Sequence, residues 1–196
     1  NPANPAAGIE TINLVANGAN STVNQLNTNL TTLNVAGEKS VTINTALNAT
    51  VTKVDASAQT AGGIDVRLTN VGNVAVTGGA GNDKVTFTGQ LTSADSFNGG
   101  DGRDTVVANL AEYTGTTYAV ASKISNVETL EIADALTTAF DAAKFTGDDT
   151  VVLAAGFANG TSVTGMQSGY TLQVRGANAG NTLTAAITNA TSPSTD

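Results

Sequence analysis

Two aspartates occupy matching places in two glycine-rich phrases near the middle of the chain. Asp83 closes the phrase GGAGND at residues 78–83, and Asp104 closes the phrase GGDGRD at residues 99–104. Glycines at these places permit positive φ and a tight turn, which points main-chain carbonyl oxygens inward while the aspartate adds a carboxylate. Calcium takes about six to eight oxygen ligands, which two stacked turns can supply together and one turn cannot. The two phrases therefore predict a calcium site shared between two turns.

A plainer interpretation of each phrase is an ordinary hairpin turn of an all-β protein. The two copies, however, begin 21 residues apart, and each has a valine two places after its aspartate, Val85 or Val106. A turn, a carboxylate and an apolar strand residue thus recur in the same order. This recurrence favours a calcium-binding array over two unrelated turns.

Extended past its valine, each phrase fits the nonapeptide G-G-x-G-x-D-x-U-x, in which U is a large apolar residue. In this respect the chain resembles the RTX (repeats-in-toxin) family of secreted bacterial proteins, whose repeats bind calcium in parallel β-rolls. The resemblance implies that the carboxylates of Asp83 and Asp104 close the site and that Asp101 is able to add its side chain. The main-chain carbonyls expected to complete the site belong to Gly78, Ala80, Asn82, Gly99, Asp101 and Arg103.

Four further residues are weaker candidates for oxygen ligands: Asp65, Asp95, Asn98 and Asp149. Asp65 stands two nonapeptides before Asp83, so one full circuit of a roll would stack it beneath Asp83. Asp149 lies in the phrase GDDTVV, which repeats the GRDTVV of residues 102–107 without the leading pair of glycines. Asp95 and Asn98 lie between the two complete phrases, where they would add ligands or remain solvated.

The composition narrows the classes of partner. The 196 residues carry a net charge of −8, which disfavours nucleic acid and anionic membrane surfaces and suits divalent cations. The chain has no cysteine and no histidine, so disulfides and thiolate or imidazole metal sites are excluded. No run of apolar residues approaches the length of a transmembrane helix. Lacking histidine, tryptophan and any basic cluster, the chain is expected not to be an enzyme.

Short apolar runs rich in β-branched residues recur along the chain at spacings near 10 residues, which predicts strands separated by turns. The runs are residues 12–15, 33–35, 41–43, 51–54, 64–68, 74–76, 85–88, 105–110, 127–132, 150–153, 170–174 and 183–187. With the glycine phrases, they predict an all-β fold, an elongated parallel β-solenoid or β-roll of about 10 circuits. We expect one irregular array over residues 8–191, with linkers at 1–7 and 192–196.

Two segments interrupt this pattern. Residues 133–145 have apolar side chains at helical spacing and predict a short helical insertion. Residues 116–125 contain enough alanine and serine for a loop or a short helix. Either segment would widen one circuit of the array.

Irregular Thr/Asn/Ala-rich β-repeats together with a few RTX turns are typical of bacterial surface-layer (S-layer) proteins, and the chain resembles a segment of one. That resemblance implies a secreted protein at the cell surface, in which calcium orders the fold or joins subunits. The expected partners are further copies of the chain in a two-dimensional lattice and cell-surface polysaccharide.

Two alternatives belong to other functional classes. An RTX adhesin or ice-binding rod would use threonines on a flat face, for which Thr-x-Thr at residues 50–52, 86–88 and 182–184 are candidates. A polysaccharide-acting β-helix enzyme would need carboxylates and basic groups in a cleft. The densest charges of that kind are Asp134, Asp141, Lys144, Asp148 and Asp149.

Overall fold

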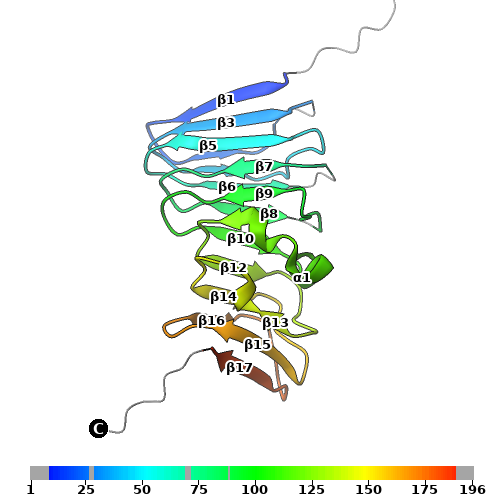
Figure 1. Ribbon diagram of the computed structural model, residues 1–196. Helices are drawn as coiled ribbons and strands as arrows, with labels where there is room; N and C mark the ends of the chain where they lie inside the picture. The colour runs from blue at the N-terminus through cyan, green and yellow to red at the C-terminus, as the bar shows by residue number, and fades with distance from the viewer. Residues whose placement is uncertain (1–8, 27–28, 69–71, 88, 189–196) are drawn as a thin grey trace, which may run out of the picture.

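The computed structural model describes residues 9–26, 29–68, 72–87 and 89–188. Over these residues the chain winds into a rod of stacked coils, with β1 at one end and β17 at the other (Figure 1). Neighbouring strands in the stack run parallel, which confirms the predicted all-β parallel solenoid. The expected linkers at 1–7 and 192–196 lie outside the described residues.

The strands form three sheets along the rod. The first sheet has the order β1 (Thr11–Ala16), β3 (Thr32–Gly37), β5 (Lys53–Gln59), β7 (Ala75–Thr77), β9 (Ser96–Asn98), β11 (Ile124–Ser125). The second has the order β2 (Ser21–Val23), β4 (Val41–Ile43), β6 (Ile64–Leu68), β8 (Lys84–Phe87), β10 (Thr105–Ala108), β12 (Thr129–Ile132), β14 (Thr150–Leu153), β16 (Thr171–Val174). The third consists of β13 (Phe140–Asp141), β15 (Thr161–Met166) and β17 (Leu183–Ile187). The second sheet, with eight strands, runs along most of the rod, so the estimate of about 10 circuits was slightly too high.

Successive coils repeat about every 21 residues, and equivalent positions stack directly on one another. Strand side chains alternate between the two faces, so every second residue points into the rod. In the second sheet the inward column contains Val85, Val106 and Leu130, none of which is exposed to solvent. Burial of such columns from facing sheets supplies the apolar core that holds the coils together.

The glycines of the two phrases lie where successive coils touch. A Cβ at Gly78 would stand 1.9 Å from the carbonyl oxygen of Gly99, and a Cβ at Gly99 would stand 2.0 Å from that of Asn126. The expected positive φ occurs at Gly100 and Gly102 but at none of the other glycines of the phrases. Most of these glycines are therefore required for close approach of two backbones rather than for a left-handed turn.

One α-helix occurs among the described residues, α1 (Leu110–Tyr118), which follows β10. Its last residues and the 3₁₀ turn η1 (Ala121–Lys123) lie in the segment 116–125, for which the sequence predicted a loop or a short helix. The short helical insertion predicted over 133–145 is limited to one 3₁₀ turn, η2 (Ala142–Lys144), because the apolar residues of that segment serve the sheets. Leu136 forms a bridge with Phe157, and Phe140 begins β13.

An aromatic cluster anchors α1 to the rod. The ring of Tyr113 lies 5.8 Å from that of Phe140 and 5.6 Å from that of Phe145, both edge to face. The Tyr113 hydroxyl donates to the carbonyl of Val106 at 2.8 Å, so this buried polar group is satisfied. The insertion therefore widens one coil without breaking the stack.

We expect Gly99→Ala to lower the free energy of unfolding by about 1–3 kcal/mol, because the added methyl group would force two coils apart. The matched control is Gly115→Ala in α1, where nothing lies within 4 Å of the new methyl group. There alanine should stabilise the protein by up to about 1 kcal/mol through helix propensity. Chemical denaturation of both variants checks this, and equal effects would contradict the close-contact role of Gly99.

Candidate functional site

The two glycine phrases stack directly on one another, as a shared site requires. In the register of the second sheet, Thr105 pairs with Lys84, so Asp83 and Asp104 occupy the same position in successive coils. The main-chain N–H of Asp83 donates to Oδ1 of Asp104 at 2.7 Å. The spacing of 21 residues in the sequence thus corresponds to one coil of the rod.

Extended along the rod, this position forms a column of four acidic residues, which we call the acidic column: Asp83, Asp104, Glu128 and Asp149. Each residue stands immediately before a strand of the second sheet. One coil earlier the same position holds Ile64, which is buried as an ordinary core residue. At Asp83 and Asp104 a buried carboxylate therefore takes the place that the apolar Ile64 has one coil earlier.

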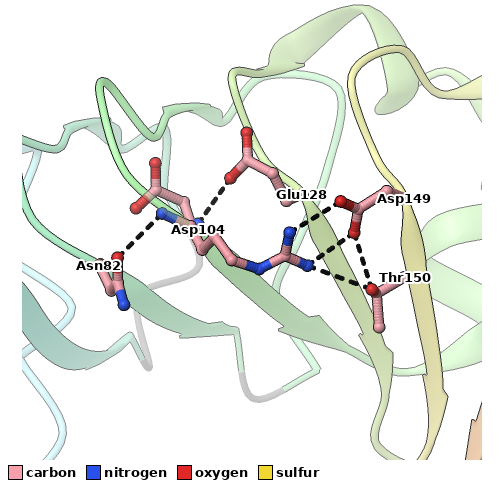
Figure 2. A network of polar contacts seen from close by, with 6 residues as sticks. Asn82, Asp104, Glu128, Asp149 and Thr150 are labelled. Atoms are coloured by element: carbon pink, nitrogen blue, oxygen red, sulfur yellow. Dashed lines mark hydrogen bonds and ion pairs between the residues drawn. The ribbon is translucent and has the colours of Figure 1, made fainter. Parts of the chain in front are cut away.

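Carboxylates of the acidic column accept main-chain N–H groups from the preceding coil. Asp83 Oδ1 accepts from Ile64 at 2.6 Å, and Glu128 Oε2 accepts from Asp104 at 2.7 Å. Together with the bond from Asp83 to Asp104, these contacts form a continuous ladder along the rod, part of which is visible in Figure 2. The ladder satisfies N–H groups that would otherwise be buried without a partner.

The two aspartates differ at their second oxygen. Asp83 Oδ2 accepts the N–H of Gly79 at 2.8 Å, whereas Asp104 Oδ2 is buried and has no hydrogen-bond donor. The point where a Cβ of Gly99 would stand is 2.2 Å from Asp104 Oδ2 and 2.0 Å from the carbonyl oxygen of Asn126. The Cα of Gly99 thus packs directly against a carboxylate oxygen and a carbonyl oxygen, a contact that only a residue without a side chain allows.

The surroundings of the Asp104 carboxylate favour a positive charge beside it. Burial raises the pKa of Asp104 to about 7, and the nearby charges of Asp83, Glu128 and Asp101 add to the rise. Burial also raises the pKa of Asp83, although the N–H groups of Ile64 and Gly79 act against it. A proton or a cation at Asp104 would relieve the cost of burying this carboxylate.

Two of the six predicted carbonyl ligands are placed differently: the carbonyl of Gly99 lies beside Asp83, and that of Asn82 points to another coil. Gly99 O lies 1.9 Å, and Asp83 Oδ2 2.1 Å, from the point where a Cβ of Gly78 would stand. By contrast, Asn82 O faces Gly63 in the preceding coil, while the Asn82 side chain accepts the N–H of Arg103 at 2.9 Å. Each aspartate thus has a carbonyl from the following coil beside it.

Two residues of the site were missed by the sequence reasoning, Asn126 and Glu128. Asn126 adopts a φ of +51° and continues the column of Gly78 and Gly99 without belonging to a glycine phrase. An asparagine followed two residues later by an acid, directly before a strand, was the available signal.

Among the described residues no three acidic side chains converge as a metal-binding group. A cation here would therefore depend on carbonyls as much as on carboxylates.

The expected stacking of Asp65 beneath Asp83 is wrong. Ile64 and Asp83 are 19 residues apart and in contact, so the coil is one residue longer than two nonapeptides. Asp65 consequently pairs with Lys84, which places it on the opposite face of the strand from Ile64.

Asp95 and Asn98 have structural partners. Asp95 is buried, with Oδ1 accepting the N–H of Val74 and Oδ2 accepting the N–H and hydroxyl of Thr92. Asn98 is exposed at the end of β9 and accepts the side-chain amide of Asn126 at 2.7 Å. The contacts with Thr92 close a turn, whereas those with Val74 and Asn126 join neighbouring coils.

The third phrase differs from the first two in the direction of its carboxylates. Asp149 faces outward and accepts hydrogen bonds from Nη1 and Nη2 of Arg103, at 2.7 and 2.6 Å (Figure 2). This ion pair lowers the pKa of Asp149. Asp148 is buried instead, and burial raises its pKa although the Tyr170 hydroxyl bonds to it. Through its ion pair with Asp149, the side chain of Arg103 links the coil of β10 to the coil of β14, two strands that β12 separates.

The outer face of the second sheet bears on the two alternative functions. One column of four threonines, Thr105, Thr129, Thr150 and Thr171, runs along it. The next outward column is mixed, because Glu131 stands in it and pairs with Lys84 and Arg175. Of the expected Thr-x-Thr pairs, Thr88 lies outside the described residues and residues 50–52 lie outside the strands. This face therefore lacks two parallel threonine columns.

Three of the five densest charges have structural partners. Asp134 accepts the N–H of Leu110 at the start of α1, 24 residues earlier in the chain. Asp141 accepts the N–H of Ala143 in η2 and pairs with Lys144. A contact between distant segments thus accounts for Asp134, and a local turn accounts for Asp141 and Lys144.

In the presence of a chelator, we expect the free energy of unfolding to fall as the pH rises from about 4 to about 7. Asp104 has a raised pKa in the folded protein, so its contribution is fully present below the ordinary carboxyl pKa and is lost above about 7. The raised pKa values of Asp83 and Asp148 act in the same direction. Thermal denaturation across this range measures the effect.

Asp104→Asn is the control for this pH dependence. The amide oxygen keeps an acceptor for the N–H of Asp83, while the amide nitrogen offers a donor near the carbonyl of Asn126. The variant should be more stable than the wild type near pH 8 and less dependent on pH. If its pH profile were as steep as that of the wild type, Asp104 would not be the titrating group.

Comparison of the chain with protein-family models, with curated proteins and with solved structures found no match. In the part of the chain that the structure describes, no helix is long and apolar enough to cross a membrane. The function of the chain must be inferred from its own residues and their geometry.

Proposed function

We propose that this chain is a non-enzymatic, calcium-binding β-solenoid section of a secreted bacterial surface-layer protein. The observation that carries the calcium part is the buried Asp104 Oδ2, which has no hydrogen-bond donor among the described residues and lies near the carbonyl oxygen of Asn126. A buried carboxylate oxygen needs a proton, a hydrogen-bond donor or a cation. The surface-layer part is supported by the likeness of the glycine phrases and of the composition to such proteins.

Calcium fits the donors better than other metals do. The chain has neither cysteine nor histidine, and the group beside Asp104 Oδ2 is the carbonyl oxygen of Asn126; oxygen is the ligand that calcium prefers. Asp104 and the carbonyl of Asn126 would hold the ion, with Asp101 near enough to influence the carboxylate. The equivalent pair one coil earlier is Asp83 with the carbonyl of Gly99.

A bound calcium ion would supply positive charge beside carboxylates whose pKa burial has raised. In this proposal the ion tunes a rod that folds mainly by apolar burial. At a tenfold excess of calcium over Kd, one site stabilises the folded state by about 1.4 kcal/mol. That amount is small beside the burial of the whole core but would recur in each copy of an assembled layer.

The adhesin alternative shares the same calcium site and differs in its partner. The ice-binding alternative is less favoured, because Glu131, Lys84 and Arg175 place charges beside the threonine column. The enzymatic alternative is less favoured as well, since Asp134 and Asp141 accept hydrogen bonds from main-chain N–H groups.

Calcium should bind to the chelator-treated protein near pH 8 with a Kd of about 0.1–1 mM and raise its melting temperature. Asp104→Asn should abolish this binding, whereas Asp65→Asn, which alters a carboxylate on the outward face of β6, should retain it. Protons compete for the same carboxylate, so the calcium response should weaken as the pH falls below about 7. Titration calorimetry with each variant provides the measurement.

Magnesium at the same concentration is a control for charge alone, because it demands a stricter octahedral geometry. Absence of saturable heat at about 10 mM calcium would contradict the site. A large gain of β-signal in circular dichroism on adding calcium would contradict the idea of a preformed rod.

Electron microscopy of the calcium-loaded protein tests the lattice. Two-dimensional arrays are expected, and isolated rods would count against the lattice.

A further inference from the structure

A polar hollow of about 400 Å³ lies on the rod beside the start of the two glycine phrases. It extends across four coils, from the end of β5 through β7 and β9 to the residue that follows β11. Its polar lining residues are Ser57, Gln59, Thr77, Asn98, Asp101 and Asn126, and the others are glycine and alanine. The hollow therefore offers hydrogen-bonding groups but no large apolar surface.

A second hollow continues the first one along the rod. It has a volume of about 480 Å³, is lined by β1, β3 and β5, and shares Ser57 with the first hollow. The strands of this sheet stand in one stack in Figure 1. We call the two hollows together the first-sheet groove, which runs along the rod.

The strands beneath the groove each contribute one polar side chain, in register with the next. The column consists of Asn34 on β3, Asp55 on β5, Thr77 on β7 and Asn98 on β9. Val54, Val76 and Phe97, which precede the last three, are buried, so the column lies on the outer face of the sheet. Neighbouring strands lie about 4.8 Å apart, which is close to the length of one sugar unit in an extended polysaccharide.

Several polar groups of the groove have hydrogen-bonding capacity to spare. Asn126 Nδ2 donates to Asn98 Oδ1 at 2.7 Å, and neither Asn98 Nδ2 nor Asn126 Oδ1 has a further partner among the described residues. The hydroxyl of Thr77 and the carboxylate of Asp101 have no hydrogen-bond partner in that part of the chain. Donors and acceptors thus occur together, which suits sugar hydroxyls because each of them both donates and accepts.

The charges of the groove disfavour an anionic polymer. Lys53 Nζ lies 2.9 Å from Asp55 Oδ2, so these two charges offset each other. Asp101 then carries the one unpaired charge among the described lining residues, and that charge is negative. A carboxylate repels an acidic polysaccharide but not a neutral one.

A protein fits the hollow at the glycine phrases less well than a sugar polymer does. Protein interfaces depend on a few large side chains that fill desolvated pockets. No lining residue of this hollow has an apolar side chain larger than that of alanine. The hollow also lies on the face of the sheet, whereas an added strand pairs with a sheet edge.

We propose that the first-sheet groove binds a neutral, extended polysaccharide that lies along the rod with about one sugar unit per coil. Sugar hydroxyls accept from Asn98 Nδ2, donate to Asn126 Oδ1 and exchange hydrogen bonds with Thr77. Because the groove follows the stack of strands, an extended β-1,4-linked chain fits it better than a helical one. The site uses neither Asp104 nor a bound calcium ion, so it is independent of the calcium proposal.

Affinity electrophoresis in native gels that contain chelator tests the groove. Gels cast with soluble glucomannan, a neutral β-1,4-linked polymer, should retard the wild type. Gels cast with polygalacturonate, an anionic polymer, should not retard it. Unchanged mobility in glucomannan, or equal retardation in the two gels, would overturn the proposal.

Variants locate the binding on the protein. Thr77→Val removes one hydroxyl from a half-buried outward position and should weaken glucomannan binding about three- to tenfold. Asn98→Ala should weaken it by a similar factor. The matched control is Thr86→Val, at a half-buried outward position on β8 of the second sheet, which should bind like the wild type. Equal binding by Thr77→Val and Thr86→Val would overturn the proposal.

Asp104→Asn separates this inference from the calcium site. The variant should lose the calcium response yet be retarded by glucomannan as the wild type is. Calcium binding without glucomannan binding in the wild type would overturn the groove proposal alone. Loss of glucomannan binding in Asp104→Asn, with an unchanged melting temperature, would overturn the independence of the groove from the acidic column.

Discussion

Close contact between the main chains of successive coils is the constraint on which the rest of this rod depends. At the glycine phrases the coils approach so closely that a methyl group on Gly78 or Gly99 would overlap a carbonyl of the next coil. Water cannot reach such a contact, so its N–H groups must find partners within the stack. The carboxylates of Asp83 and Glu128 are among these partners, each accepting an N–H from one coil earlier.

This use of carboxylates creates an electrostatic conflict inside the rod. Hydrogen bonds from main-chain N–H groups favour the charged form, whereas burial and neighbouring carboxylates disfavour it, and for Asp104 the second effect is larger. On the outer face a carboxylate can be neutralised by an ion pair, as Asp149 is by Arg103. The inner position of Asp104 has no such partner. In the calcium proposal, stacking and cation binding are therefore linked, because Asp104 accepts the N–H of Asp83 in the ladder and also has a buried oxygen without a donor.

Four predicted strands have the bounds that the structure gives them. The runs at 41–43, 64–68, 150–153 and 183–187 form β4, β6, β14 and β17. The strands β2 and β9, which the sequence did not predict, have three residues each and few apolar side chains. Their extended conformation is imposed by pairing with the coils on either side. The sequence predicted a helical insertion over residues 133–145 because Leu136 and Phe140 fit helical spacing and strand burial equally well.

The sequence by itself determined the parallel β-solenoid and the pairing of Asp83 with Asp104, because their spacing equals one coil and glycine is needed at each contact. It did not determine the full length of the acidic column. The coil between Asp104 and Glu128 is widened by α1, so the constant offset that relates the first two phrases fails there. Asn126 and Glu128 join the site only through the stacking of this longer coil. The tertiary structure also decided whether a carboxylate faces the core or the solvent. Asp148 faces the core and Asp149 faces the solvent, because the direction of each side chain depends on the residues that neighbouring coils place beside it.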